Sequence, residues 1–253
     1  MDKEKTTDFS SRLMCDFHVH TTHSDGKLPM RRVIDLFGES GHDAIAITDH
    51  ITDTKGLFGR AAIALRRTVT PGGARAYFEE IAHEARRAWE RYRMIVIPGA
   101  EITHNAATRH RSCHILALGI TEYLSADRSP LQILKEIRRR GAASVACHPH
   151  ETSEWFASTF YLWNRRRRLA PYIDRWEVAC RWDLFPAVSR EKLPSIANGD
   201  FHREEHLHAW KTIVHAPRDA SAVLSVLKSR VPLSFTQLLP ETAPALSLQP
   251  AFA

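Results

Sequence analysis

The sequence has 253 residues, 43% of them hydrophobic, and its 35 lysines and arginines exceed its 29 aspartates and glutamates to give a formal net charge of +6. This length fits one large domain better than two, with enough apolar residues for a sizeable core. No apolar run reaches the roughly 18 residues needed to span a bilayer, and residues 1–12 form a polar extension without the apolar segment of a secretion signal. We therefore expect a cytoplasmic protein without a membrane partner, and the basic balance suits an anionic partner, either a small phosphorylated molecule or nucleic acid.

The positions of the cysteines are typical of a protein in a reducing compartment. The four of them, Cys15, Cys113, Cys147 and Cys180, are far apart in the sequence and lie in apolar, strand-like segments. They are therefore expected to be reduced, buried thiols.

The first predicted element is a strand at 14–20 that runs into a turn. Because side chains alternate along a strand, His18 and His20 share one face, and Asp25 follows in the turn. Two imidazoles in this spacing can reach one metal ion, with a carboxylate close by. Taken alone, the pair could equally be two ordinary histidines near a surface, so the metal-site interpretation depends on the rest of the chain.

The rest of the chain alternates between predicted strands and helices. Short apolar runs predict buried strands at 44–48, 94–98, 113–119, 143–147, 176–180, 195–198 and 212–215. Apolar residues at helical spacing predict helices at 29–40, 77–92, 129–140, 155–170 and 220–229. Residues 51–74 lack a clear period and are expected to form a mobile loop with a short helix at 61–67. The alternation favours a parallel α/β barrel over a doubly wound sheet, in a single domain at 13–237 followed by a Pro- and Ala-rich tail at 238–253.

Potential metal ligands lie close to the ends of these strands. They are His18, His20, Asp25, His50, Glu101, His114, His148, Asp200 and His202. All lie at or just past the carboxyl end of a predicted strand except His114, which stands near the start of strand 113–119. In a parallel barrel these carboxyl ends meet at one mouth, where active sites form. Nine ligands are too many for one ion, so we expect two or three divalent ions, Zn, Mn or Fe, that share bridging carboxylates.

The order of these segments resembles that of the PHP family, the polymerase and histidinol phosphatase domains. The matching segments are DFHVHT at 16–21, SDG at 24–26, TDH at 48–50, PGAE at 98–101, HIL at 114–116, HP at 148–149 and GDFH at 199–202. Each segment alone is a weak signal, but the ordered set is specific and extends over residues 14–215. Asp25 stands where some phosphatases of the family carry a histidine.

The resemblance implies a distorted parallel (β/α)7 barrel with a trinuclear metal site at its C-terminal mouth. One metal would be held by His18, His20, Glu101 and Asp200, a second by Glu101, His114 and His148, and a third by Asp25, His50 and His202. Glu101 would bridge the first two. The resemblance also implies that a metal-bound hydroxide, held by the four ligands of the first metal, attacks the phosphorus of a substrate.

We therefore expect a metal-dependent phosphoesterase that hydrolyses a small phosphorylated metabolite or nucleotide. Divalent ions neutralise the phosphate, lower the pKa of a bound water and stabilise the leaving oxygen. Four arginines near the expected mouth could hold phosphate oxygens, namely Arg109, Arg111, Arg181 and Arg203. Taken singly, each is more often a solvated surface charge.

Four further residues stand beside the expected ligands. Asp16 and Asp49 could orient an imidazole from behind. His23 and His150 could protonate a leaving group, although a supporting or merely exposed position is the more common one for such residues.

Two other functions remain open at this point. Nucleases of the TatD type and amidohydrolases also begin with His-x-His, but amidohydrolases commonly need a lysine at a mid-chain strand end, and none stands there. The TDH segment at 48–50 and His202, two residues after Asp200, fit the PHP pattern better than the TatD pattern. The second alternative is a non-catalytic PHP module that binds metal. The complete ligand set argues against it.

One arginine run also suggests nucleic acid. Residues 165–168 are four consecutive arginines, and aromatic residues precede them within the predicted helix 155–170. Interleaved aromatics and arginines could bind single-stranded nucleic acid. A helix that packs its aromatic side on the domain and exposes its basic side to water is the favoured interpretation.

Overall fold

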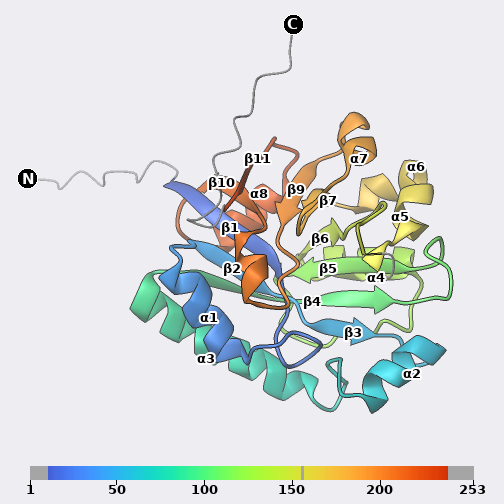
Figure 1. Cartoon of the computed structure of the whole chain (residues 1–253), viewed down its shortest axis with the longest axis horizontal. Helices are drawn as coiled ribbons and strands as arrows, with labels where there is room; N and C mark the ends of the chain where they lie inside the picture. Colours follow the sequence, from blue (N-terminus) through green and yellow to red (C-terminus); the bar gives the residue numbers. More distant parts are fainter. Residues whose placement is uncertain (1–10, 155–156, 239–253) are drawn as a thin grey trace, which may run out of the picture.

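The computed structural model describes residues 11–154 and 157–238 of the chain (Figure 1). Most of the expected N-terminal extension, all but the first residue of the expected C-terminal tail, and residues 155–156 of the predicted helix 155–170 lie outside these ranges. Ser11 and Arg12, which were expected to belong to the extension, are the first two residues of a strand.

Eleven strands form one sheet with the order β11-β10-β1-β2-β4-β5-β6-β7-β8, in which β3 pairs with β4 and β9 pairs with β7. Their bounds are β1 Ser11–Val19, β2 Ala44–Ile47, β3 His50–Thr52, β4 Ile95–His104, β5 Cys113–Leu118, β6 Ala143–Ala146, β7 Arg175–Cys180, β8 Asp183–Leu184, β9 Ser195–Asn198, β10 Trp210–Ala216 and β11 Ser234–Gln237. The central strands are short and almost wholly buried, as their apolar runs predict.

Helices flank this sheet (Figure 1). They are α1 Met30–Glu39, α2 Leu57–Ala64, α3 Ala74–Tyr92, α4 Pro130–Arg139, α5 Phe160–Asn164, α6 Arg166–Leu169, α7 Pro186–Arg190 and α8 Ala220–Lys228, with 3-10 turns at Ala170–Tyr172 and Glu204–His208. Local signals explain where several of them begin. Ser129 and Gln132 form a reciprocal capping box at the start of α4, and the Asp219 side chain caps α8. None of the described helices is long and apolar enough to cross a membrane.

The α/β class is confirmed, but the expectation of parallel strands throughout is wrong. The pairs β1–β2, β2–β4, β3–β4, β6–β7 and β7–β9 are parallel, whereas β1–β10, β10–β11, β4–β5, β5–β6 and β7–β8 are antiparallel. The connection at 105–112 shows the reason. It contains no helix, and a parallel pair needs a crossover of about a dozen or more residues. Strand β5 therefore folds back on β4 as a hairpin.

Two other expectations about elements need correction. The loop expected at 51–74 contains most of strand β3 and helix α2, which overlaps the predicted helix 61–67 but begins and ends a few residues earlier, at Leu57 and Ala64. The single helix expected at 155–170 is two short helices, α5 and α6, separated by Arg165. Both errors concern short elements whose few residues carry little periodic signal.

The sheet curls into a half-barrel, which brings strands from the two ends of the chain together. Phe201, just beyond β9, forms an isolated parallel bridge with Val19. The Thr212 hydroxyl of β10 bonds to both the backbone N–H and the carbonyl of Ala197 in β9. Because of this curl, the ends of β1, β2, β4, β6 and β9 face a common space.

Candidate functional site

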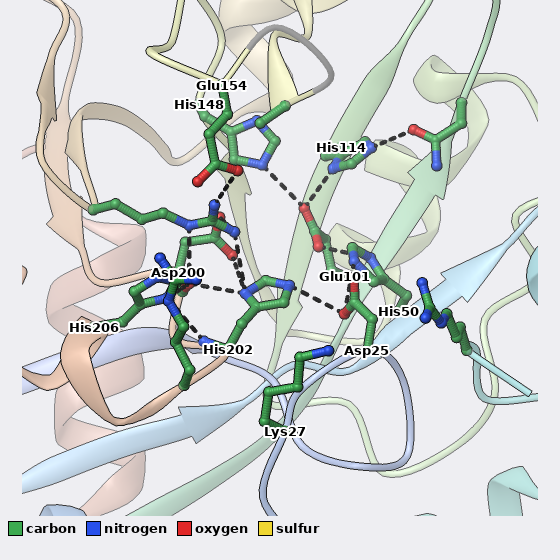
Figure 2. A pocket seen from close by; sticks show the side chains of 15 residues that line it. Asp25, Lys27, His50, Glu101, His114, His148, Glu154, Asp200, His202 and His206 are labelled. Carbon is green, nitrogen blue, oxygen red and sulfur yellow. Dashed lines mark hydrogen bonds and ion pairs between the residues drawn. The ribbon is translucent and has the colours of Figure 1, made fainter.

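The nine predicted ligands gather at one edge of the curled sheet. Seven of them line a cavity of about 370 Å³, namely Asp25, His50, Glu101, His114, His148, Asp200 and His202 (Figure 2). His18 and His20 lie beneath it and are fully buried. The structure therefore brings together the side chains of all nine predicted metal ligands.

Strand direction explains the position of His114. In the antiparallel pair β4–β5, His114 lies directly opposite Thr103, so the start of β5 is next to the end of β4. The histidine that stood at the wrong end of a parallel strand is thus at the correct edge of a mixed sheet. Its Nδ1 atom is 2.8 Å from Glu101 Oε1.

The first group of ligands is built around a point between four side chains. His18 Nε2 lies 3.5 Å from Glu101 Oε2 and 3.3 Å from Asp200 Oδ1. His20 Nε2 lies 3.4 Å and 3.3 Å from the same two atoms. Among the described residues, His18 Nε2, His20 Nε2 and Glu101 Oε2 are buried polar atoms without a hydrogen-bond partner. Buried polar atoms rarely remain unsatisfied, so this set fits a divalent cation.

The second group shares Glu101 with the first. The other carboxylate oxygen of Glu101, Oε1, lies 2.8 Å from His114 Nδ1 and 3.6 Å from His148 Nε2. Glu101 thus presents one oxygen to each group, as a bridging carboxylate would.

The third group lies at the mouth of the cavity. Asp25 Oδ1 is 3.1 Å from His202 Nε2 and 3.5 Å from His50 Nε2, and it too lacks a hydrogen-bond partner within the described ranges. Figure 2 shows Asp25 facing both histidines. His50 also connects this group to the others, since its Nδ1 is 2.8 Å from Glu101 Oε2.

Glu177, which the sequence prediction missed, supports two of the histidines. This fully buried glutamate of β7 lies with Oε1 3.0 Å from His18 Nδ1, and its other oxygen accepts the backbone N–H of His148. The Asn198 amide donates to Oε1 as well. A proton on His18 Nδ1 that faces Glu177 leaves Nε2 free to bind a metal. In the sequence, the only sign of this role was that Glu177 is a single acidic residue within the strand 175–180.

His20 is oriented through a serine. Ser24 donates its hydroxyl proton to Asp49 Oδ1 at 2.6 Å, so the Ser24 oxygen can accept from His20 Nδ1, 3.3 Å away. Thr21 also donates to Asp49 with its backbone N–H and hydroxyl group. Asp49 thus lies behind His20 and is connected to its ring only through Ser24.

Asp16 contacts no imidazole, contrary to expectation. One of its oxygens accepts the backbone N–H groups of His18 and Gly199, the latter 183 residues away in the sequence, and the other pairs with Lys211 Nζ at 2.8 Å. Both charged side chains are fully buried. Any side chain at Gly199 would collide with Asp16, so this position requires glycine. Asp16 thus ties the strand that carries His18 to the loop that carries Asp200.

The pKa shifts suit metal binding at His20 and Glu101, whereas His50 would have to release a proton to bind an ion. Burial, together with His202 and His50, lowers the pKa of His20 to about 3. Burial would raise the pKa of Glu101, but His114 and His50 outweigh it and hold the pKa well below its usual value. Burial opposes the charge on His50 as well, but Glu101 and Asp25 outweigh it and raise its pKa to about 9. His20 is therefore a neutral imidazole and Glu101 a carboxylate, the forms that bind metal ions.

Two of the four predicted phosphate-binding arginines line the cavity. Arg181 forms ion pairs with Asp200 at 2.9 Å and with Glu154 at 2.6 Å, and Arg203 lies at the exposed rim. Arg109 instead pairs with Glu151 and lines a neighbouring cavity, and Arg111 lines neither. Two cations in the wall were not predicted, Lys27 and Arg67, because each lies in a loop without a motif.

The remaining predicted residues lie away from the cavity. His23 pairs with Glu80 at 2.8 Å. The His150 ring packs against Phe160 and Trp163, with ring centroids 5.1 and 5.5 Å apart, and burial lowers its pKa. Neither histidine lines the cavity with the nine ligands.

The arginine run is largely engaged with its own surroundings. The Arg165 guanidinium lies 3.9 Å from the Tyr161 ring centre, and that of Arg166 lies 4.1 Å from the Trp163 ring centre. Arg166 also pairs with Glu191. Trp163 is buried, so the aromatic side packs inward and the basic side faces water, as the favoured interpretation expects.

Comparison with known proteins places these features in context. The sequence pattern of the PHP domain matches residues 16–144, about half of the chain. No curated protein matches the sequence.

Solved structures resemble the fold. A two-domain protein from Bacteroides vulgatus, described as containing a predicted PHP-like metal-dependent phosphoesterase, has 21% sequence identity and a TM-score of 0.66, over 91% of this chain and 66% of that one. At this identity the similarity shows the fold alone, and the chain spans less than two thirds of that structure. A proposed metal-dependent phosphoesterase from Bifidobacterium adolescentis has 15% identity and a TM-score of 0.47, over 76% of this chain and 88% of that one. An amidohydrolase from Chromobacterium violaceum, with bound sulfate and no metal, has 16% identity and a TM-score of 0.45, over 74% of this chain and 87% of that one.

Proposed function

The chain belongs to the PHP domain family, and from this premise we propose that it is a metal-dependent phosphoesterase that hydrolyses a small phosphorylated metabolite or nucleotide. The observation that carries the proposal is the set of unsatisfied buried atoms on His18, His20 and Glu101, which converge with Asp200 beneath the cavity. Such a set of imidazoles and carboxylates fits Zn, Mn or Fe.

The residues of the three groups would hold two or three divalent ions. His18, His20, Glu101 and Asp200 would hold the first, Glu101, His114 and His148 the second, and Asp25, His50 and His202 the third. Bound there, such ions supply positive charge to the phosphate and lower the pKa of a bound water. The hydrogen bonds of Glu177 and Ser24 keep the Nε2 atoms of His18 and His20 directed at this point.

Cations in the cavity wall support a phosphorylated substrate. Lys27, Arg67, Arg181 and Arg203 line the same cavity as the ligands. Arg181 is held in place by Asp200 and Glu154, so its guanidinium group is oriented before a phosphate arrives. A cavity of about 370 Å³ suits a small ester. Two of the four arginines in the run, Arg165 and Arg166, are already stacked on neighbouring aromatic side chains, which gives a nuclease function less support.

We also infer a cytoplasmic location. All four cysteines lie within the described residues, and each is buried and free. Buried, unpaired thiols are typical of a reducing compartment.

Removal of metal is expected to abolish the activity reversibly. The purified protein should hydrolyse p-nitrophenyl phosphate, lose this activity on dialysis against a chelator, and regain it when Mn²⁺ or Zn²⁺ is added, since His18 Nε2, His20 Nε2 and Glu101 Oε2 have no hydrogen-bond partner among the described residues. Release of p-nitrophenol measures the rate, and bis-p-nitrophenyl phosphate and an oligonucleotide test diesters in parallel. If no metal supports hydrolysis of any of these esters, the chain is a non-catalytic module.

Glu177→Gln is expected to weaken metal binding by about 10- to 100-fold without unfolding the protein. The carboxylate accepts hydrogen bonds with both oxygens, whereas the glutamine amide nitrogen only donates, so either His18 or the backbone of His148 loses its acceptor. Calorimetric titration of the apo-protein with Mn²⁺ measures the change.

Asp174→Asn is the matched control for this variant. Asp174 precedes the same strand and bonds to Ser144, at the end of β7 away from the cavity. Its replacement should leave metal affinity unchanged. An equal loss of affinity in both variants would show that Glu177 acts only through the stability of β7.

A further inference from the structure

A second cavity, of about 240 Å³, borders the one that holds the ligands. Its walls come from helix α2, the β4–β5 loop and the segment before α5, through Phe58, Asn105, Ala106, Ala107, Arg109, Ser112 and Ser158. Asn105 lines both cavities, and the consecutive residues Ala157 and Ser158 line the first and the second respectively. The two cavities therefore share a wall and meet at Asn105.

Asn105 faces the ligand histidines on one side of this junction. Its Oδ1 lies 2.9 Å from His114 Nε2, so a proton on Nε2 directs the other ring nitrogen, Nδ1, to Glu101. The Nδ2 amide group has no hydrogen-bond partner among the described residues. It is available to donate to a molecule that extends from the first cavity into the second.

Phe58 gives the second cavity an aromatic rim. Its side chain is 47% exposed, although a phenyl ring is normally buried. Helix α2 is seated firmly, because any side chain at Gly59 would collide with the carbonyl of Asp53. The backbone N–H of Gly56, just before the helix, also bonds to the Asp53 side chain. These contacts on either side of Phe58 fix the backbone that places Phe58 at the rim.

The one charged side chain that lines this cavity, Arg109, is already paired with a carboxylate. The Arg109 guanidinium pairs with Glu151 at 2.9 Å and lies 5.0 Å from the Phe160 ring centre. The other lining residues include Ala106, Ala107 and two serines, Ser112 and Ser158, whose hydroxyl groups already accept the backbone N–H groups of Ala106 and Thr152. This lining suits a flat, uncharged group that can form a few hydrogen bonds, and it offers no site for a second phosphate.

We propose that the second cavity binds the organic part of the substrate, and that the preferred substrates are phosphomonoesters with a flat aromatic or heteroaromatic group stacked on Phe58. This inference rests on the proposed function, because the phosphate is assigned to the first cavity. In this arrangement Asn105 Nδ2 donates a hydrogen bond to the ester where it passes between the cavities.

The test measures binding of two phosphonates that cannot be hydrolysed. Phenylphosphonate and methylphosphonate are titrated calorimetrically into the full-length protein loaded with Mn²⁺. Phenylphosphonate should bind about tenfold more tightly, as expected for one additional aromatic contact. In Phe58→Ala the two affinities should become equal, through weaker binding of phenylphosphonate alone.

Leu57→Ala is the matched control. Leu57 is the neighbouring residue of α2 and is 78% exposed, but it lines neither cavity. Its replacement should leave both affinities unchanged. Equal binding of the two phosphonates to the wild-type protein, absence of binding, or an equal effect of both variants would overturn the inference.

The outcomes also separate this inference from the proposed function. If phenylphosphonate is preferred but no phosphoester is hydrolysed, the subsite is present and the proposed function fails. If p-nitrophenyl phosphate is hydrolysed but the two phosphonates bind equally, the proposed function holds and the subsite is absent.

Discussion

Glu101→Gln is expected to lower kcat for p-nitrophenyl phosphate by about 10³-fold or more, with the fold intact. Glu101 is the centre of the ligand set, because its two oxygens lie within 3.6 Å of ring nitrogens from five histidines. Glutamine has the same shape but carries no charge, so both metal groups that share Glu101 would be weakened. Metal ions contribute several kcal/mol to catalysis, and each 1.4 kcal/mol corresponds to about a factor of ten. Activity assays and the metal content of the purified variant measure the effect, and circular dichroism measures the fold.

Glu84→Gln provides the control for the loss of a buried carboxylate. Glu84 is 4% exposed on α3 and binds Arg87, outside the residues that line the cavity. This variant should keep its metal content and its activity. If Glu101→Gln bound metal and turned over substrate like the wild type, the centre described here would not be the catalytic one. His18→Ala is expected to behave as Glu101→Gln does, since it removes a ligand of the first metal. Unfolding of both ligand variants would instead assign the metals a structural role.

Lys211→Met is expected to destabilise the protein by about 3–5 kcal/mol, because it leaves the Asp16 carboxylate buried without its counter-charge. Both partners are fully buried, and the Nζ–Oδ2 distance is 2.8 Å. The urea midpoint, followed by tryptophan fluorescence, should fall accordingly. Metal affinity should fall as well, since Asp16 holds the backbone of His18 and Gly199 in place.

Two further variants distinguish a buried ion pair from a simple loss of packing. Asp16→Asn combined with Lys211→Met removes both charges and should recover part of the stability lost in Lys211→Met. Arg75→Met removes one partner of the exposed pair Arg75–Glu79 and should leave the urea midpoint almost unchanged. A double variant no more stable than Lys211→Met would show that the charge of Asp16 is not the cause.

The ligand positions could be found from the sequence because the signals are local. His18 and His20 alternate on one strand, and His50, Glu101, His148 and Asp200 each follow an apolar run within a few residues. The likeness to the PHP domains, which the family match confirms, added the order of these segments. Their assignment to particular ions remains a prediction, although the three proposed groups do come together in the structure.

The direction of the strands could not be found in the same way. An apolar run of five residues looks alike in parallel and antiparallel pairs, and only the absence of a helix at 105–112 distinguishes them. The supporting residues were missed for a different reason. Glu177 contacts His18 across 159 residues, and Lys211 contacts Asp16 across 195. No local pattern connects such partners, so only the folded structure reveals them.

The bond between Gly199 and Asp16 also affects how the protein folds. It joins segments 183 residues apart, and closing so long a loop costs entropy that only the completed sheet can offset. The ligand-bearing strand at one end of the domain and the ligand-bearing loop near the other therefore meet late, together with the global transition. An ion that binds only the completed centre then stabilises the whole domain by mass action, by about 2.7 kcal/mol at a free concentration 100 times its dissociation constant. Metal supply would then set the stability of the folded domain as well as its activity.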